Sequence, residues 1–399
     1  MGTIKLLQAA DLHVRDRDIE EIEKCLAKIV DTARDESVDL IVLCGDTFDS
    51  QDIKMDSKSA RLVVKTVSEM ADICPVAIIS GTPTHEGKAP EILRFARGKH
   101  PIKVASVPDQ WRALIGGQEI IITMMPQPTK QFFQTAAGIE ASDREIGSAM
   151  SALFAGYGAK AAQHPGLTHI LIYHGCISGG KASNNQAMTG RDIEINRDQL
   201  ALSGASLILC GHLHLPQELP GSIFYSGSIY ATDIGEDHEH GFYIHLLERG
   251  IALNEDHERV HAVSTFIETP CKRLLRYAFD YTDPAALPAL DANAEDVAGA
   301  TVRIDAIVWQ DEAKKYDFDA MKTNLLRWGA ESVEIKISIQ PRVNVRAESV
   351  LAATTLRAEV EELAKLREET IDPDVLVKAD LLELTPGDEL LQRIAGPSL

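Results

Sequence analysis

The chain has 399 residues, of which 45% are hydrophobic and 25% charged, and its formal net charge is −20. This length predicts two or three domains, and the ordinary composition excludes a chain that is mainly disordered. The acidic balance argues against a protein that simply coats nucleic acid, because such proteins carry a basic surface. A nuclease is not excluded, since metal ions neutralise phosphate locally and basic residues can gather on one face.

The sequence carries no sign of export or membrane insertion. The segment before Asp11 is too short for a signal peptide, and no run approaches the roughly 18 apolar residues of a membrane span. The six cysteines form no Cys-x-x-Cys pair, and several lie in apolar runs. We therefore expect a cytoplasmic protein with reduced thiols packed as small hydrophobic side chains, at Cys25, Cys44, Cys74, Cys176, Cys210 and Cys271.

Strand and helix patterns alternate over the first 250 residues. Short apolar runs typical of buried strands lie at residues 4–9, 38–44, 75–80, 120–124, 169–173 and 206–210. Apolar residues recur at helical spacing from Ile19 onward, and again from Leu62 to Met70. Strands that are apolar on both faces and alternate with helices predict a sheet that is covered on both sides.

The pattern changes after residue 250. Residues 302–308 and 333–339 alternate apolar and polar side chains, and residues 318–328 between them have helical spacing, which predicts a small strand–helix–strand domain. From residue 346 the sequence is acidic and helical, and Pro373 stands at an expected helix start. Two apolar stripes mark these helices: Leu356, Val360 and Leu363, and then Val375, Ala379 and Leu382.

Acidic and histidine side chains follow the ends of the predicted strands. The first two strands lead to Asp11, His13 and Asp46, and the remaining such residues are His85, His174, His212 and His214. Ligands of open α/β sheets bind at the carboxyl ends of the strands, so we expect these side chains to meet at one rim.

Carboxylate oxygens and imidazole nitrogens suit a pair of divalent ions such as Mn, Fe or Zn. Asp-x-His and His-x-His each place two ligands beside one strand end, and Asp46 is the natural bridge between two ions about 3.5–4 Å apart. Each motif alone also has a structural explanation. Asp11 with His13 suits a helix cap, Asp46 a turn, and His174 a satisfied core histidine, but the whole set in this order favours a two-metal phosphoesterase.

The motif order DLH, GDTFD, GTPTHE, YHG and GHLH resembles the calcineurin-like metallophosphoesterases. Phe48-Asp49, the run at 225–228 and the run at 235–242 are similar to the SbcD type, the nuclease subunit of SbcCD-type DNA-repair complexes. This resemblance implies a four-layer α-β-β-α phosphoesterase domain at 1–250, a small α/β capping domain at 265–345 and a C-terminal helical segment at 346–399.

The resemblance also implies partners and roles for individual residues. It suggests Mn²⁺ as the native ion, DNA as substrate, a coiled-coil SbcC-type ATPase that docks on residues 346–399, and a homodimer formed by the helices after Arg17 and Ser57. One ion would be held by Asp11, His13, Asp46 and His214, and the other by Asp46, His174 and His212. His85 matches the family's catalytic histidine near the scissile phosphate.

One motif departs from the family pattern. The family reads Gly-Asn-His-Asp and uses the Asn as a metal ligand, whereas this chain reads Gly81-Thr82-Pro83-Thr84-His85-Glu86. Three replacements are open: a hydroxyl of Thr82 or Thr84, a water, or His85 itself turned inward.

Further candidates surround this set. Asp49 is a candidate to orient a ligand, and Thr84, Lys181 and Arg191 are candidates for phosphate contact, although each also suits a solvated loop. The acidic and histidine cluster at 236–240 is read mainly as a solvated turn, and Cys176 as a packed thiol.

Two other classes of function compete with the nuclease. The same ligands would serve a stand-alone phosphodiesterase or phosphatase acting on a small, nucleotide-like substrate. A non-catalytic scaffold that retains the fold is the third class, and the altered loop at 82–86 is its one support.

Overall fold

The computed structural model describes residues 3–128, 143–183, 193–248, 262–283, 297–341, 348–387 and 389–390. The chain divides into two compact units. The first unit contains the two large sheets and the whole of the site discussed below.

The first sheet has six strands in the order β14-β13-β1-β2-β3-β4. Strands β1 to β4 are parallel, whereas β13 pairs antiparallel with both β1 and β14. Their bounds are β1 Thr3–Ala9, β2 Leu40–Leu43, β3 Val76–Ile79, β4 Ile102–Ala105, β13 Gly241–Glu248 and β14 Ala262–Glu268. The strands predicted at 4–9, 38–44 and 75–80 are confirmed.

The second sheet also has six strands, in the order β11-β12-β10-β7-β6-β5. Its centre is parallel from β6 through β7 and β10 to β12, and the two edge strands are antiparallel. The bounds are β5 Asp109–Ile115, β6 Gln118–Met125, β7 Thr168–His174, β10 Leu207–Gly211, β11 Gln217–Leu219 and β12 Ile223–Tyr225. Strands β8 (Cys176–Ile177) and β9 (Glu194–Ile195) form a separate short pair.

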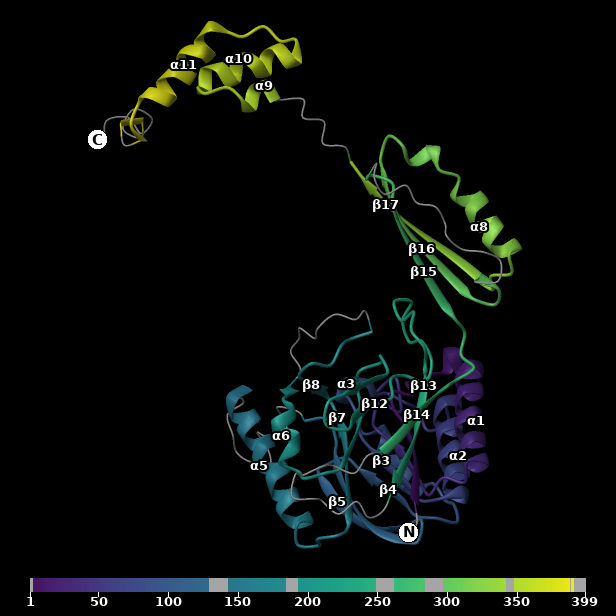
Figure 1. The fold of residues 1–399 in the computed structure, drawn as a ribbon. Helices are drawn as coiled ribbons and strands as arrows, with labels where there is room; N and C mark the ends of the chain where they lie inside the picture. Colours follow the sequence, from purple (N-terminus) through teal and green to yellow (C-terminus); the bar gives the residue numbers. More distant parts are fainter. Residues whose placement is uncertain are drawn as a thin grey trace. The chain divides into compact units, whose positions relative to one another are not determined.

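Three apolar layers hold these elements together. The helices α1 (Ile19–Asp35) and α2 (Lys58–Ile73) pack on the outer face of the first sheet. The inner faces of the two sheets pack on each other. The helices α5 (Asp143–Ala161) and α6 (Arg197–Ala201) cover the second sheet. The predicted four-layer α-β-β-α arrangement is confirmed and can be followed in Figure 1.

Burial on both faces explains the continuous apolar strands. In β1, Leu6 joins the layer between the sheets and Leu7 joins the layer beneath α1 and α2, and both are 0% exposed. Successive side chains of a strand point to opposite faces, so a strand with two covered faces needs no polar alternation.

The elements after residue 270 follow the predicted pattern. β15 (Leu274–Asp280), β16 (Thr301–Trp309) and β17 (Ser332–Gln340) form a three-stranded sheet, and α8 (Phe318–Arg327) connects β16 to β17. The predicted strand–helix–strand unit is thus present and includes a third strand. The helices α9 (Glu348–Leu351), α10 (Leu356–Arg367) and α11 (Pro373–Leu384) follow, with Pro373 in the first turn of α11 as expected. The proposed domain boundaries remain predictions.

The structure bears on the expected absence of membrane spans and on the expected packing of the thiols. Within the described ranges, no helix combines the length and apolarity needed to cross a bilayer. Five cysteines are buried and Cys271 is half-buried, in agreement with thiols that serve packing. Cys176 lies in the layer between the second sheet and its helices.

Candidate metal centre

The candidate site forms where the parallel strands of both sheets end. Strands β1, β2 and β3 end just before the segments that carry Asp11, Asp46 and Thr82. Strand β7 ends at His174, and β10 ends one residue before His212. Parallel neighbours end at the same edge of a sheet, so the fold alone brings these side chains to one rim.

The backbone at this rim is unusual. The described residues include seven non-glycine positions with positive φ, and four of them belong to the site: Asp11 (50°), His13 (40°), Asp46 (48°) and His212 (100°). Non-glycine residues rarely adopt this region, and such strain clusters at functional sites. Packing alone does not explain why four Asp and His residues with strained backbones lie in one place.

Glycines allow the strand ends to approach one another. A Cβ at Gly45 would lie 2.3 Å from Nδ1 of His174, and one at Gly81 would lie 2.2 Å from the backbone nitrogen of Asp46. Both distances are too short for any other residue, so Gly45 permits the contact between the two sheets and Gly81 the close approach of the ends of β2 and β3.

The carboxylate of Asp46 lies at the centre. Its Oδ2 atom is 2.9 Å from Nδ1 of His85 and 2.9 Å from Oγ1 of Thr82. The same oxygen is 3.4 Å from Nε2 of His174 and 3.8 Å from Nε2 of His13. Asp46 is 1% exposed. One buried carboxylate therefore reaches the ligands of both predicted ions, as a bridging ligand must.

Three sets of side chains have ligand atoms close enough to share an ion. Within each set these atoms lie within 4.8 Å of one another. The sets are Asp11, His13 and His214; His13, Asp46 and His85; and Asp46, His174 and His212. The structure thus brings together all seven residues predicted from the sequence, in three sets, two of which contain Asp46.

Backbone groups orient two of these ligands. Nδ1 of His174 donates to the carbonyl of Cys44 at 2.6 Å, so its Nε2 atom is left facing Asp46. The backbone nitrogen of His212 donates to both carboxylate oxygens of Asp11, at 2.9 and 3.0 Å. The first hydrogen bond fixes the tautomer and ring direction of His174, and the second pair holds the carboxylate of Asp11 in place.

Glu236 orients a third ligand, a role that the sequence did not predict. The cluster at 236–240 was expected to be mainly a solvated turn; Asp237 and Glu239 are indeed exposed, but Glu236 and His240 are only 5% and 4% exposed. Nδ1 of His214 donates to Glu236, which also accepts from the backbone nitrogen of Thr232 at 2.8 Å. Burial raises the pKa of Glu236, but the contact with His214 outweighs it and lowers the pKa to about 2.

Replacement of Glu236 with Gln should weaken binding of the ion held by His214. The carboxylate raises the basicity of the imidazole, and loss of such an outer partner typically costs about 10–100-fold in metal affinity. Competition with a chelator measures this affinity, and Glu218→Gln, an exposed site on β11, is the matched control. Equal affinities in the two variants would show that Glu236 does not act on the metal site.

Asp49 lies where an orienting acid was expected, beside His13. Its Oδ1 is 3.3 Å from Nδ1 of His13, outside hydrogen-bonding geometry, and its Oδ2 accepts from Arg15 at 3.3 Å. Tyr230 donates its hydroxyl proton to the carbonyl of His13 at 2.8 Å. Arg15 and Tyr230 were not anticipated, because no local motif connects them to the ligands.

The altered loop places Thr82 and His85 in the site and leaves Thr84 outside it. Oγ1 of Thr82 lies 3.3 Å from Nε2 of His174 and 3.5 Å from Nδ1 of His212, within the second group of ligands. His85 turns inward onto Asp46. Thr84 is exposed. Of the open replacements for the family's Asn, the hydroxyl of Thr82 is thus the side-chain oxygen closest to the second ion's ligands.

A buried carboxylate, Glu86, connects the loop to the strand end of Asp46. It accepts hydrogen bonds from the backbone nitrogens of Gly81, Thr47 (2.7 Å) and Phe48 (3.3 Å). Burial, with the nearby charge of Asp46, raises the pKa of Glu86 to about 7. No sequence signal indicates this role beyond the position of Glu86 next to His85.

Two further candidates remain from the sequence, Lys181 and Arg191. Arg191 lies outside the described residues. Lys181 is exposed, and its backbone nitrogen donates to Gln217 at 2.9 Å.

The donor set fits divalent cations on two observations. The Nε2 atoms of His13 and His214 lie 3.1 Å apart, close enough for both to bind one cation. Burial lowers the pKa of both His174 and His214, but adjacent carboxylates outweigh burial and raise each pKa to about 9. In the metal-free protein the raised pKa values favour protonated imidazoles at His174 and His214, next to these carboxylates.

Metal binding should therefore release protons. Folding raises the pKa of His174 and His214 from 6.5 to about 9, so the stability they give the metal-free protein is complete below pH 6.5 and is lost as the pH rises to about 9. A metal needs the neutral imidazole, so its affinity should rise over the same range. Calorimetric titration with Mn²⁺ at pH 7.5 in two buffers of different protonation heat should give different heats, and equal heats would contradict this.

Comparisons with known proteins give only distant likenesses. No family model matches the sequence, and no curated protein matches it. Solved structures that resemble the chain include GAP50, the anchor in the inner membrane complex of Plasmodium, with 12% identity and a TM-score of 0.41 over 67% of this chain and 90% of that one. A dimetal phosphatase from Danio rerio shares 10% identity with a TM-score of 0.37 over 67% and 99% of the two chains. A hypothetical protein from Thermus thermophilus has 14% sequence identity and a TM-score of 0.32, over 67% of this chain and 100% of that one.

Proposed function

We propose that the chain is a two-metal phosphodiesterase that cleaves DNA. The observation that carries this proposal is the buried carboxylate of Asp46, which reaches two adjacent groups of Asp and His ligands. Two ions that share a carboxylate are the usual means of in-line displacement at a phosphodiester.

The ligand assignment is the one that the resemblance implies, and the three sets of neighbouring ligand atoms support it. Asp11, His13, Asp46 and His214 would hold one ion, and Asp46, His174 and His212 the other, with the hydroxyl of Thr82 beside it. When bound, the ions supply a metal-activated water as nucleophile and neutralise the charge that develops on the phosphate. Mixed carboxylate and imidazole ligands suit Mn²⁺, which we propose as the native ion, and they also accept Mg²⁺, Fe²⁺ or Zn²⁺.

The chain's own side chains would orient the reaction. Asp46 fixes the ring of His85 through Nδ1, so the remaining nitrogen is available to protonate the leaving oxygen. The hydrogen bond to Asp46 raises the pKa of His85, which favours the protonated form that a proton donor needs.

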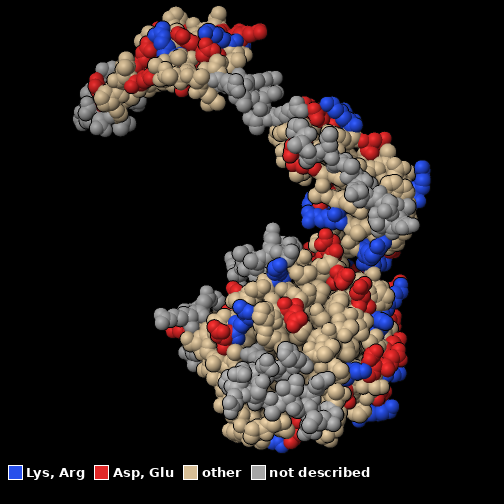
Figure 2. All heavy atoms as spheres, viewed as in Figure 1, with Lys and Arg blue, Asp and Glu red and all other residues tan. Residues whose placement is uncertain are grey.

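We propose an SbcCD-type complex as the setting of this activity. The motif order supports a nuclease subunit, and a coiled-coil ATPase would dock on residues 346–399. The helices there expose apolar side chains that a partner would cover, among them Leu366, Val375 and Leu382. Acidic and basic side chains mix on the surface seen in Figure 2. A partner that contributes much of the DNA affinity would reconcile this surface with the charge of −20.

Two smaller proposals belong to the same reading. The sheet of β15 to β17 with α8 would be a capping domain that positions the duplex. A homodimer would form through α1 and α2, as the resemblance implies. The rival activity, hydrolysis of a small nucleotide-like ester, would use the same ligands without DNA or a partner.

A cleavage assay on labelled linear DNA with Mn²⁺ tests the proposal. We expect cleavage by the wild type, alone or with the ATPase partner, and partner-dependent cleavage should disappear when residues 346–399 are deleted. Rapid hydrolysis of a nucleotide ester without any DNA cleavage would favour the rival. Absence of activity with every divalent ion would favour a scaffold.

A further inference from the structure

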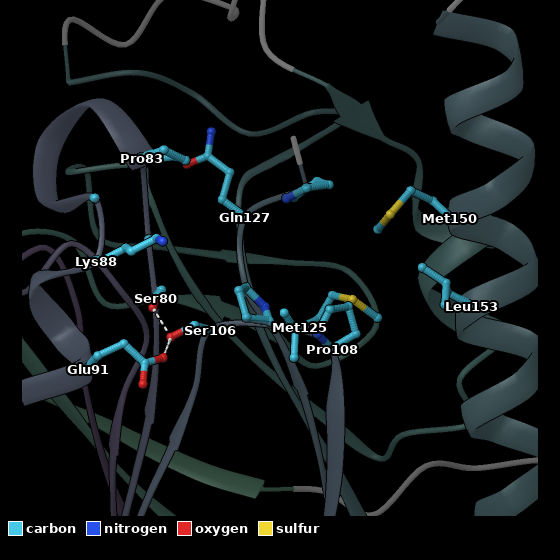
Figure 3. A pocket seen from close by; sticks show the side chains of 15 residues that line it. Ser80, Pro83, Lys88, Glu91, Ser106, Pro108, Met125, Gln127, Met150 and Leu153 are labelled. Carbon is cyan, nitrogen blue, oxygen red and sulfur yellow. Dashed lines mark hydrogen bonds between the residues drawn. The ribbon is translucent and has the colours of Figure 1, made fainter. Parts of the chain in front are cut away.

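A cavity of about 490 Å³ lies beside the metal ligands. It opens at the ends of β3, β4 and β6, the same rim at which β7 delivers His174, and α5 closes one side. Figure 3 shows Met150 and Leu153 of α5 facing Pro83 and Gln127 across the opening. Cavities of this volume are typical of small-molecule and cofactor sites.

The cavity is continuous with the candidate metal centre through one loop. Gly81 and Pro83 line the cavity, and Thr82 between them contacts Asp46 at 2.9 Å. A phosphate held by the ions would thus lie one residue away from the cavity wall. Only the group attached to that phosphate could reach inside.

The walls are mostly apolar, with Lys88 and Glu91 as the charged residues among them, and they suit a flat group. Pro108, Met125, Met150 and Leu153 contribute much of the lining, and the thioethers adapt well to aromatic faces.

A few polar atoms would recognise the edge of that group. Within the described residues, the buried Oε1 atom of Gln127 has no hydrogen-bond partner, and Gln127 lines the cavity. At the opposite wall Ser80 donates to Ser106, which donates to Glu91, so those groups satisfy one another (Figure 3). Once a turn of the Gln127 side chain exposes this buried oxygen, it can accept a hydrogen bond from the N–H edge of a nucleobase.

We infer that this cavity binds the nucleobase next to the scissile phosphate, an inference that rests on the proposed phosphodiesterase activity. A base within a duplex is stacked and cannot enter a pocket without leaving the helix. The substrate is therefore an unpaired nucleotide, either at a frayed or single-stranded DNA end or in a small nucleotide ester.

Two model esters test the pocket with Mn²⁺ and the full chain. Thymidine 5′-(p-nitrophenyl phosphate) carries a base, and methyl p-nitrophenyl phosphate does not. We expect kcat/KM to be at least about tenfold higher for the thymidine ester. Val107→Trp should block the cavity, because Val107 lines it and is 58% exposed, and the ratio should fall toward one. Leu114→Trp, at an exposed site near the opposite end of β5, should keep the wild-type ratio.

Each outcome decides one claim. A ratio near one in the wild type, or an unchanged ratio in Val107→Trp, would overturn the base pocket and leave the hydrolase intact. If neither ester reacts, the chain does not hydrolyse small esters by itself, and binding of thymidine measured by NMR tests the pocket independently of activity. Thymidine binding that is lost in Val107→Trp would support it, and no binding to the wild type would overturn it. Faster cleavage of unpaired than of blunt DNA ends would identify DNA as the source of the base.

Discussion

Asp46→Asn should lower phosphodiester hydrolysis by at least about 10³-fold. Loss of one group that stabilises a developing charge already costs about 10²–10³-fold, and here a single carboxylate serves both ions. Asn keeps the size of the side chain and can still accept from the backbone nitrogen of Thr82, so the fold should persist. Its neutral amide cannot bridge two cations.

The control for this variant is Asp31→Asn. Asp31 lies on α1, where it pairs with Arg34 at an exposed surface. That variant should hydrolyse substrate at the wild-type rate. Activity in Asp46→Asn within tenfold of wild type, with unchanged metal content, would mean that Asp46 is not the bridge.

His85→Ala should lower kcat by about 10²–10⁴-fold while both ions remain bound. This is the contribution expected from a positioned proton donor. The His85 side chain is 43% exposed and hydrogen-bonds to Asp46 on one side, so it is both oriented and open to substrate. Because the contact with Asp46 raises the pKa of His85, the wild-type rate should fall on the alkaline side as this proton is lost.

Metal content distinguishes the two roles open to His85. It belongs to one of the three groups of ligand atoms, with His13 and Asp46. If His85→Ala loses an ion as well as activity, His85 is a ligand and the proton donor lies elsewhere. His100→Ala, at an exposed histidine, should change neither quantity.

The sequence predicts the expected metal ligands because the fold brings the ends of parallel strands together. Asp11, Asp46 and His174 each follow a buried strand, and parallel strands end together. Apolar runs and the residues after them are local features of the chain, so the sequence alone predicts them. The same reasoning predicts the layered sheets.

The residues that support these ligands from outside could not be predicted in this way. Glu236 reaches His214 across 22 positions and a turn, and Arg15 reaches Asp49 across 34. Such contacts depend on how loops pack, which no periodic pattern encodes. Helix α5 was also missed, since Gly147, Gly156 and Gly158 interrupt its helical pattern.

Titration of the metal-free chain with Mn²⁺, followed by electron paramagnetic resonance, tests the central claim most directly. The proposed bridge predicts two ions per chain and a spin-coupled signal from a pair about 3.5–4 Å apart. Asp46→Asn should abolish the coupling. One isolated ion per chain, or none, in the wild type would contradict a two-metal centre.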